Sequence, residues 1–187
     1  YSNPTSGLDT SSVDPEATGL QEYVVTQGNA LFYGFEAAAD YHPTRWLEFE
    51  LGSDYTYAQN QVLDQPIPWI APLRIRYSAR VTGGSGTWYR APYVSVGAST
   101  VAAKAASRVD PNELEPGTPV PGGYTLVNIG AGADVILGSQ VISINFDLLN
   151  ALNQQYVWFL NRYRNFVEDS RILGMGRNFM VRMSWTF

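Results

Sequence analysis

Residues 176–187 read Gly-Arg-Asn-Phe-Met-Val-Arg-Met-Ser-Trp-Thr-Phe, and their alternation decides the fold. Apolar side chains take every second position from Phe179 to Phe187, and the positions between them are polar except for Met180. A β-strand directs alternate side chains to opposite faces, so this strand has one bulky apolar face and one mostly polar face. Such an apolar, aromatic face is typical of a membrane barrel, whose outer surface contacts lipid.

The composition agrees with a membrane barrel and argues against several other classes of protein. Charged residues make up 16% of the 187 residues, below the roughly 25% that is usual in soluble domains. The 12 Tyr and 5 Trp match the aromatic girdles that mark membrane interfaces. A net charge of −5 argues against nucleic acid as a partner, and the absence of Cys excludes disulfides and thiolate metal sites.

Alternation continues along the chain and predicts an all-β, antiparallel, up-and-down portion of a transmembrane β-barrel, with about seven strands. These strands are expected at about 20–41, 45–60, 73–82, 88–102, 127–137, 142–148 and 176–187. Residues 1–19 are rich in Ser, Thr, Pro and Gly, which favours a loop outside the cell. Gly28-Asn29 is expected to form a bulge or bend in the first strand.

Short and long connections alternate between the expected strands. The short turns lie near residues 43, 84 and 139, and the long connections near 60–70, 103–123 and 151–173. Outer-membrane barrels have the same rhythm, with short periplasmic turns and long outer loops.

The polar positions of two neighbouring strands carry opposite charges. They are Glu48, Glu50 and Asp54 on one strand and Arg74, Arg76 and Arg80 on the next. Opposite charges on neighbouring strands form cross-strand pairs, so we expect a charge-paired wall facing a water-filled or plugged lumen. The alternative is the exposed face of a soluble antiparallel sheet, which alternates in the same way.

Four segments carry a resemblance to a known family. They are Asn29-Ala-Leu-Phe-Tyr-Gly-Phe-Glu36, Gly52-Ser-Asp-Tyr-Thr-Tyr57 with its following prolines, Asn150-Ala-Leu-Asn-Gln-Gln-Tyr156, and residues 176–187. In their order and spacing over about 20–187, they resemble the C-terminal part of the barrel of TonB-dependent outer-membrane receptors. Ala151 stands where the family usually has Leu.

The resemblance implies a place and a task for the chain. Such receptors lie in the outer membrane of Gram-negative bacteria and import scarce nutrients, most often ferric siderophores, with energy supplied through TonB. Their 22-stranded barrel surrounds an N-terminal plug domain, and about seven strands cannot enclose such a lumen. We therefore expect the chain to be one part of a receptor, without the plug, with outer-membrane lipid and the rest of the receptor as partners.

The sequence predicts neither an enzyme nor a bound cofactor or metal. His42, the single His, lies beside Pro43 at an expected turn, which favours a turn residue over a catalytic base or a haem ligand. No Ser-containing elbow motif accompanies it, so a catalytic triad is not indicated.

Two groups of residues are candidates for binding. The first combines aromatic and basic side chains in an expected outer loop, as ligand capture requires: Tyr156, Trp158, Phe159, Arg162 and Arg164. The alternative for this group is an aromatic girdle above the membrane. In the family that the chain resembles, the closing strand is read by the outer-membrane insertion machinery, and the matching residues are Val181, Met183, Trp185 and Phe187.

A second function remains open at this point, from a different class. A small soluble β-barrel, such as a lipocalin-like carrier, would direct the apolar positions inward and the charged positions outward. Detergent dependence separates the two, since a lipid-facing wall partitions into detergent and a carrier does not.

Overall fold

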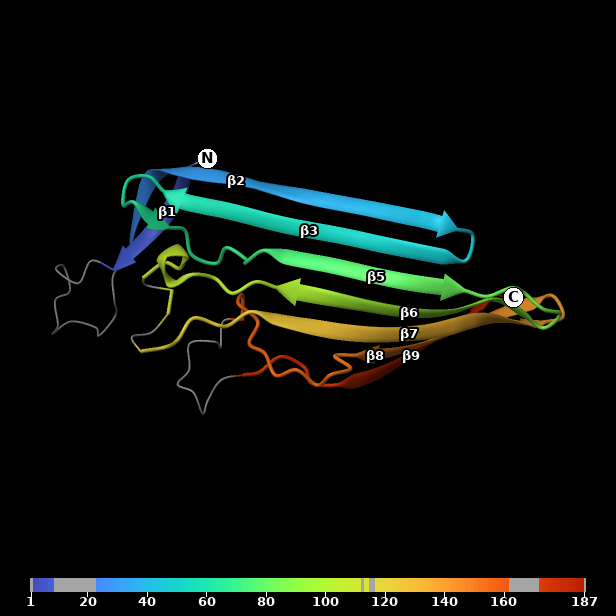
Figure 1. Cartoon of the computed structure of the whole chain (residues 1–187). Helices are drawn as coiled ribbons and strands as arrows, with labels where there is room; N and C mark the ends of the chain where they lie inside the picture. Colours follow the sequence, from blue (N-terminus) through green and yellow to red (C-terminus); the bar gives the residue numbers. More distant parts are fainter. Residues whose placement is uncertain (1, 9–22, 112, 115–116, 162–171, 187) are drawn as a thin grey trace.

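The chain folds into one curved antiparallel sheet. The computed structural model describes residues 2–8, 23–111, 113–114, 117–161 and 172–186 (Figure 1). Its elements are β1 (Ser2–Leu8), β2 (Tyr23–Thr44), β3 (Leu47–Asn60), β4 (Gln65–Pro66), β5 (Arg74–Thr82), β6 (Tyr89–Val101), the 3₁₀ turn η2 (Ala106–Arg108), β7 (Tyr124–Leu137), β8 (Gln140–Leu149) and β9 (Asn178–Thr186). The described residues contain no helix that is long and apolar enough to cross a membrane.

The strands form a meander in which each pairs with the next. Their order is β1-β2-β3-β5-β6-β7-β8-β9, all pairs are antiparallel, and the short β4 lies beside the end of β3. The seven predicted strands are confirmed as β2, β3 and β5–β9. Long connections gather at one end of the sheet and short turns at the other, with the C-terminus at the short-turn end (Figure 1).

The N-terminal segment differs from the expectation of a loop over residues 1–19. Ser2–Leu8 is strand β1, which pairs with the first part of β2 so that Ser2 lies opposite Asn29. Backbone pairing therefore outweighs the loop-like composition of this segment. The predicted irregularity at Gly28-Asn29 marks a change of neighbour, because the next residue, Ala30, pairs with Asn60 of β3.

The turn predicted at residues 42–44 is displaced along the chain. β2 continues to Thr44, and the turn consists of Arg45 and Trp46. The pairing register shifts between Tyr41 and Thr44. Pro43 lies in this interval and lacks the N–H group that a regular ladder needs, which accounts for the irregularity.

The turn predicted at Gly138-Ser139 is confirmed as a two-residue hairpin loop. Leu137 pairs with Gln140, and Gly138 has a φ of 63°. A positive φ at the first central residue is what a type II′ hairpin turn requires, and glycine adopts it without steric cost.

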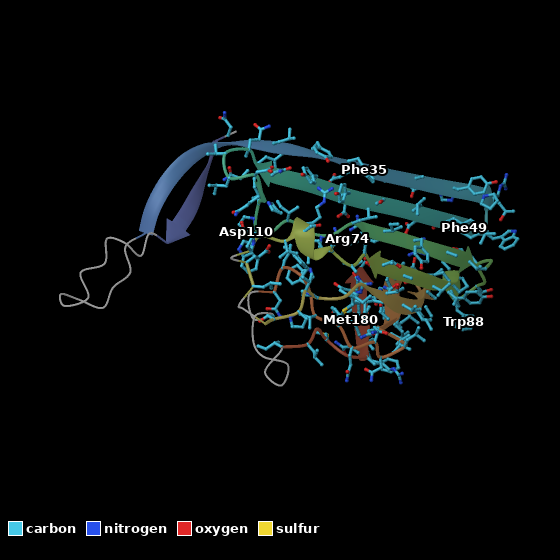
Figure 2. The ribbon with its side chains drawn as sticks, turned by 60° about the vertical axis from the view of Figure 1, so that its left-hand side comes forward. Phe35, Phe49, Arg74, Trp88, Asp110 and Met180 are labelled. Atoms are coloured by element: carbon cyan, nitrogen blue, oxygen red, sulfur yellow. The ribbon has the colours of Figure 1, made fainter. Side chains whose placement is uncertain are left out.

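Neither face of the sheet is covered by a second layer in the described part of the chain. Its fully buried apolar side chains belong to Ala58, Ile67, Val109 and Phe159, at the end where the long connections lie. Figure 2 shows this end at Asp110 and the short-turn end at Trp88. The buried apolar side chains therefore gather at the end of the sheet where the long connections pack, and the rest of the strands form a wall that is exposed on both faces.

Candidate functional site

The first face of the wall, the apolar face, contains Leu47, Phe49 and Leu51 of β3. The register continues it across seven strands without a polar residue, in the row Tyr41, Phe49, Ala79, Val96, Ile129, Leu148 and Phe179. Large side chains of this face are exposed, among them Phe179 at 74%. An exposed apolar surface of this extent marks contact with another apolar phase or a partner.

Aromatic pairs lie at two levels of the apolar face. Tyr33 and Tyr57 stack with ring centroids 4.5 Å apart near the long connections, and Tyr41 and Phe49 lie 6.5 Å apart near the short turns. Tyr57 and Phe49 are separated by eight positions, which span about 26 Å along the strand. A strand tilted by about 40° from the membrane normal then rises about 20 Å between these two residues. This spacing is comparable with the roughly 25 Å apolar band of outer-membrane barrels.

The opposite face, the polar face, carries ion pairs between β3 and β5. Arg74 donates to Asp54 over 3.0 Å, and a nitrogen of Arg76 lies 3.6 Å from the same carboxylate. Glu50 accepts a hydrogen bond of 2.8 Å from Ser78, which lies directly opposite it.

Glu48 and Arg80 occupy opposite positions in the register of β3 and β5. The Nε2 of His42 lies 3.9 Å from the Glu48 carboxylate, whereas Arg80 lies 4.5 Å from the ring centroid of Tyr93. Of the six charged residues that the sequence singles out, direct pairs therefore join Arg74 and Arg76 to Asp54.

Further pairs on the polar face were not predicted from the sequence. Arg182 of β9 donates to Asp147 of β8 over 2.9 Å, and Arg90 of β6 donates to Asp134 of β7 over 3.0 Å. The first pair could have been found, because both residues occupy polar positions of strands that were predicted as neighbours. The second pair is hidden by a register shift between Arg90 and Tyr93.

A hydrogen bond on the polar face spans β7. The Tyr93 hydroxyl of β6 donates to Asn145 of β8 over 2.8 Å. Gly132 of β7 lies opposite both residues, and a Cβ there would come within 2.8 Å of the Tyr93 ring and 2.6 Å of the Asn145 amide oxygen. Because Gly132 has no side chain, Tyr93 of β6 and Asn145 of β8 can form a hydrogen bond across β7.

The sheet curves toward its polar face. Arg80 and Tyr93 line a common hollow with Asn145 and Arg182, although three strands separate Arg80 on β5 from Arg182 on β9. Residues so far apart in the sheet order can line one hollow only on a concave surface. A carrier with apolar side chains inside would curve the other way, so the curvature favours a wall with an aqueous interior.

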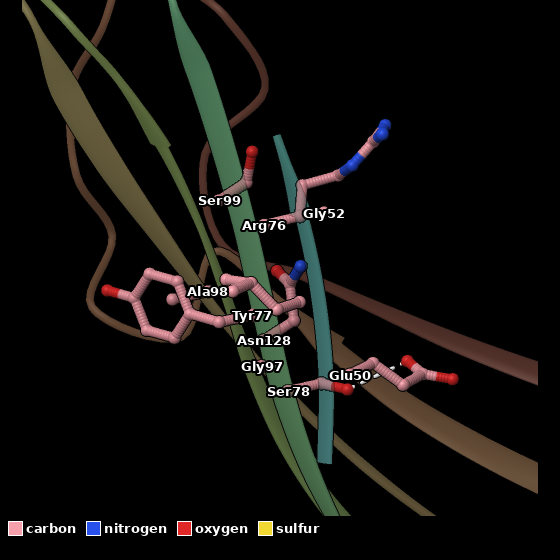
Figure 3. A pocket seen from close by; sticks show the side chains of 10 residues that line it. Glu50, Gly52, Arg76, Tyr77, Ser78, Gly97, Ala98, Ser99 and Asn128 are labelled. Carbon is pink, nitrogen blue, oxygen red and sulfur yellow. Dashed lines mark hydrogen bonds between the residues drawn. The ribbon is translucent and has the colours of Figure 1, made fainter. Parts of the chain in front are cut away.

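A second hollow, of about 350 Å³, lies on the polar face over β3, β5 and β6. Gly52 and Gly97 are among the residues that line it. Glu50, Ser78 and Arg76 project to one side of the strands and Tyr77 to the other (Figure 3). The polar face thus offers a carboxylate, a hydroxyl and a guanidinium to whatever fills the interior.

The long connections pack together into a structure that we call the loop cap, consisting of residues 61–73, 102–123, 150–161 and 172–177 where described. Lys104 donates to the carbonyl of Ile70 over 2.8 Å and lies 4.6 Å from the ring centroid of Phe159. The backbone N–H of Trp69 donates to Glu113 over 2.9 Å. These contacts join three connections that are far apart in the sequence.

The residues predicted to bind a ligand differ in how far their side chains are exposed. Phe159 is 2% exposed, so in this conformation its ring contacts protein rather than solvent, unlike a ring that is presented to a ligand. Tyr156 packs against Tyr124 with ring centroids 4.5 Å apart, and Trp158 is 53% exposed. Arg162 and Arg164 lie outside the described residues.

Asn150 has a structural role that the sequence did not reveal. Asn150 is 3% exposed. Its side-chain amide nitrogen donates to the backbone carbonyls of Gln154 and Met175, and its amide oxygen accepts from the backbone N–H of Gln154. Its φ is 47°, a left-handed conformation that Asn tolerates better than most residues. Asn150 thereby fastens the end of β8 to the segment that leads into β9.

The residues predicted as an insertion signal lie on the apolar face of β9. Val181, Met183 and Trp185 are each more than half exposed, and Phe187 lies outside the described residues. No cluster of His, Asp and Glu in the described residues is arranged to hold a metal ion.

No protein-family model and no curated protein sequence matches this chain. Its structure is similar to that of the copper transporter OprC, a TonB-dependent outer-membrane receptor, with a TM-score of 0.71 and 16% sequence identity. The match covers 87% of this chain and 24% of OprC, so the chain spans about a quarter of the length of that transporter. At this identity the similarity establishes the fold. The chain therefore has the fold of one part of a TonB-dependent receptor barrel, as the resemblance in its sequence predicts.

Proposed function

We propose that this chain is part of the wall of a Gram-negative outer-membrane transporter that imports a scarce nutrient with energy supplied through TonB. The observation that carries the proposal is the division of the sheet into a largely apolar face and a concave, charge-paired polar face. Lipid outside and water or a plug inside satisfy both faces.

In this proposal the chain contributes wall and outer loops, and other parts of the receptor supply the plug and the contact with TonB. Glu48, Glu50, Asp54, Arg74, Arg76 and Arg80 line the lumen. The loop cap lies outside the cell, where it first meets the nutrient. The outer-membrane insertion machinery reads β9 and Phe187.

A ferric siderophore is the cargo that we propose. Siderophore complexes are bulky and often anionic, and aromatic and basic side chains such as Trp158, Arg162 and Arg164 suit such ligands. Copper, the cargo in the name of OprC, is the competing candidate.

Uptake by the full-length receptor tests the proposal. Cells that lack the receptor are complemented with the wild type and supplied with ⁵⁵Fe-siderophores or with copper, with and without TonB. We expect TonB-dependent accumulation of iron; accumulation of copper alone would replace the proposed cargo, and uptake without TonB would refute the mechanism.

A pair of variants tests ligand capture by the connection between β8 and β9 within the same assay. Arg162→Ala with Arg164→Ala is expected to lower uptake several-fold at unchanged receptor level in the membrane. The control is Arg45→Ala, which removes an Arg from the turn at the opposite end of the sheet. Equal uptake by all three proteins would exclude these two arginines from ligand capture.

A further inference from the structure

Most carboxylates on the polar face of β3 to β9 are accompanied by a cation on a neighbouring strand, and Glu50, which accepts from Ser78, is the exception. Asp54 is paired with Arg74, Asp134 with Arg90 and Asp147 with Arg182. Glu48 lies opposite Arg80 in the register. At these four carboxylates the wall balances charge from strand to strand, as cross-strand pairing favours.

Glu36 and Asp40 of β2 depart from this pattern. Glu36 lies directly opposite Asp54, and Asp40 lies directly opposite Glu50, so each faces a like charge across the ladder. Neither has an ion pair among the residues that the structure describes. Like charges in opposite positions destabilise a strand pair.

The two carboxylates lie on a strand that has one edge open. Residues 30–44 of β2 pair with β3 on one side and have no neighbour on the other among the described residues. An edge of this kind presents unpaired backbone groups to an incoming strand. The two carboxylates that face like charges thus lie where the strand pairing is incomplete.

β1 fixes the register in which that edge would be filled. It runs antiparallel to β2 with Ser2 opposite Asn29 and Leu8 opposite Tyr23, so the numbers of paired residues always add to 31. A chain that continued β1 backwards beyond Tyr1 would run along the open edge. In this register the sixth and tenth residues before Tyr1 face Glu36 and Asp40.

We propose that the open edge of β2 pairs with the segment directly preceding Tyr1 in the full-length protein, and that this segment carries Lys or Arg at the sixth and tenth positions before Tyr1. These cations neutralise Glu36 and Asp40 on the polar face. The proposal rests on the proposed function in one respect, that the wall belongs to a larger barrel.

Cysteine cross-linking in the full-length protein tests the register. The 187 residues contain no Cys, and directly opposite residues in an antiparallel pair are close enough for a disulfide. Glu36→Cys is expected to cross-link with Cys at the sixth position before Tyr1. Cys at the fifth position faces the other side of the sheet and is the negative control, while Asp54→Cys with Glu36→Cys is the positive control.

Two outcomes overturn the proposal. A positive control that cross-links while the sixth position does not would refute the pairing. Acidic or apolar residues at both the sixth and tenth positions would refute the charge balance. If the positions are basic, replacing the sixth by Glu should lower the urea midpoint of unfolding, and Glu36→Lys should restore it.

Transport assays keep this inference separate from the function. A receptor that cross-links as expected but imports no nutrient would contradict the proposed function and leave the strand pairing intact. A receptor that imports the nutrient but does not cross-link would contradict only the pairing.

Discussion

Gly132→Ala tests how the polar face holds neighbouring strands together. The added Cβ would come within 2.6 Å of the Asn145 amide oxygen, 2.7 Å of the Ile144 carbonyl oxygen and 2.8 Å of the Tyr93 ring. The Tyr93 ring and the Asn145 amide can rotate away, but the Ile144 carbonyl belongs to the β8 backbone. The substitution therefore breaks the Tyr93–Asn145 hydrogen bond and strains the β7–β8 pair.

The expected cost follows from three contributions. Loss of the hydrogen bond costs about 0.5–1.5 kcal/mol, and overpacking against a backbone atom costs about 1–3 kcal/mol. Replacing Gly by Ala inside a strand stabilises the folded protein by about 0.5–1 kcal/mol, because Gly loses more conformational freedom on folding. We expect a net loss of about 0.5–4 kcal/mol in the free energy of unfolding.

Urea unfolding of the full-length protein in detergent, followed by tryptophan fluorescence, measures this loss. Gly84→Ala is the matched control, because its Cβ would meet no atom within 4 Å and its stability should not fall. Tyr93→Phe removes only the hydroxyl and should cost about 0.5–1.5 kcal/mol. In the Gly132→Ala background, Tyr93→Phe should cost almost nothing further. Unchanged stability of Gly132→Ala, or full additivity of the two substitutions, would refute this reasoning.

Two further predictions concern the last third of the chain. Asn150→Ala removes three side-chain hydrogen bonds at a residue with a φ of 47° and should cost about 3–5 kcal/mol; a change below about 1 kcal/mol in urea unfolding would contradict its anchoring role. Deleting Phe187 removes at most about 1.5–3 kcal/mol of burial, so refolding into detergent should change little while folded receptor in the outer membrane of cells falls many-fold. Equal losses in both assays would mean that Phe187 is structural only.

The two faces of the sheet could be predicted from the sequence because the side-chain period of a strand is two. A shift of one residue would exchange every side chain between the faces, so the assignment of Leu47 or Phe49 to the apolar face depends on parity alone. Parity also placed Asp54 and Arg74 on one face. It does not determine which residues stand opposite each other, and Glu50 accordingly meets Ser78 rather than an Arg.

Features that depend on contacts between distant segments could not be predicted. Phe159 is buried because the connection containing Lys104 packs over it, and no periodic pattern in either segment indicates this. Ser2–Leu8 has the composition of a loop and becomes a strand because the first part of β2 pairs with it. In both cases a partner far along the chain decides the local structure.

The orientation of the wall is the central claim, and site-directed spin labelling of the full-length protein in lipid tests it most directly. Labels replace residues of the apolar face, Leu47, Phe49, Leu51 and Ile75, and residues of the polar face, Glu48, Glu50 and Arg76. We expect labels on the apolar face to be relaxed by lipid-soluble oxygen and labels on the polar face by a water-soluble reagent, alternating along β3. The reverse accessibility, with the apolar face shielded from lipid, would contradict a barrel wall and favour a soluble carrier.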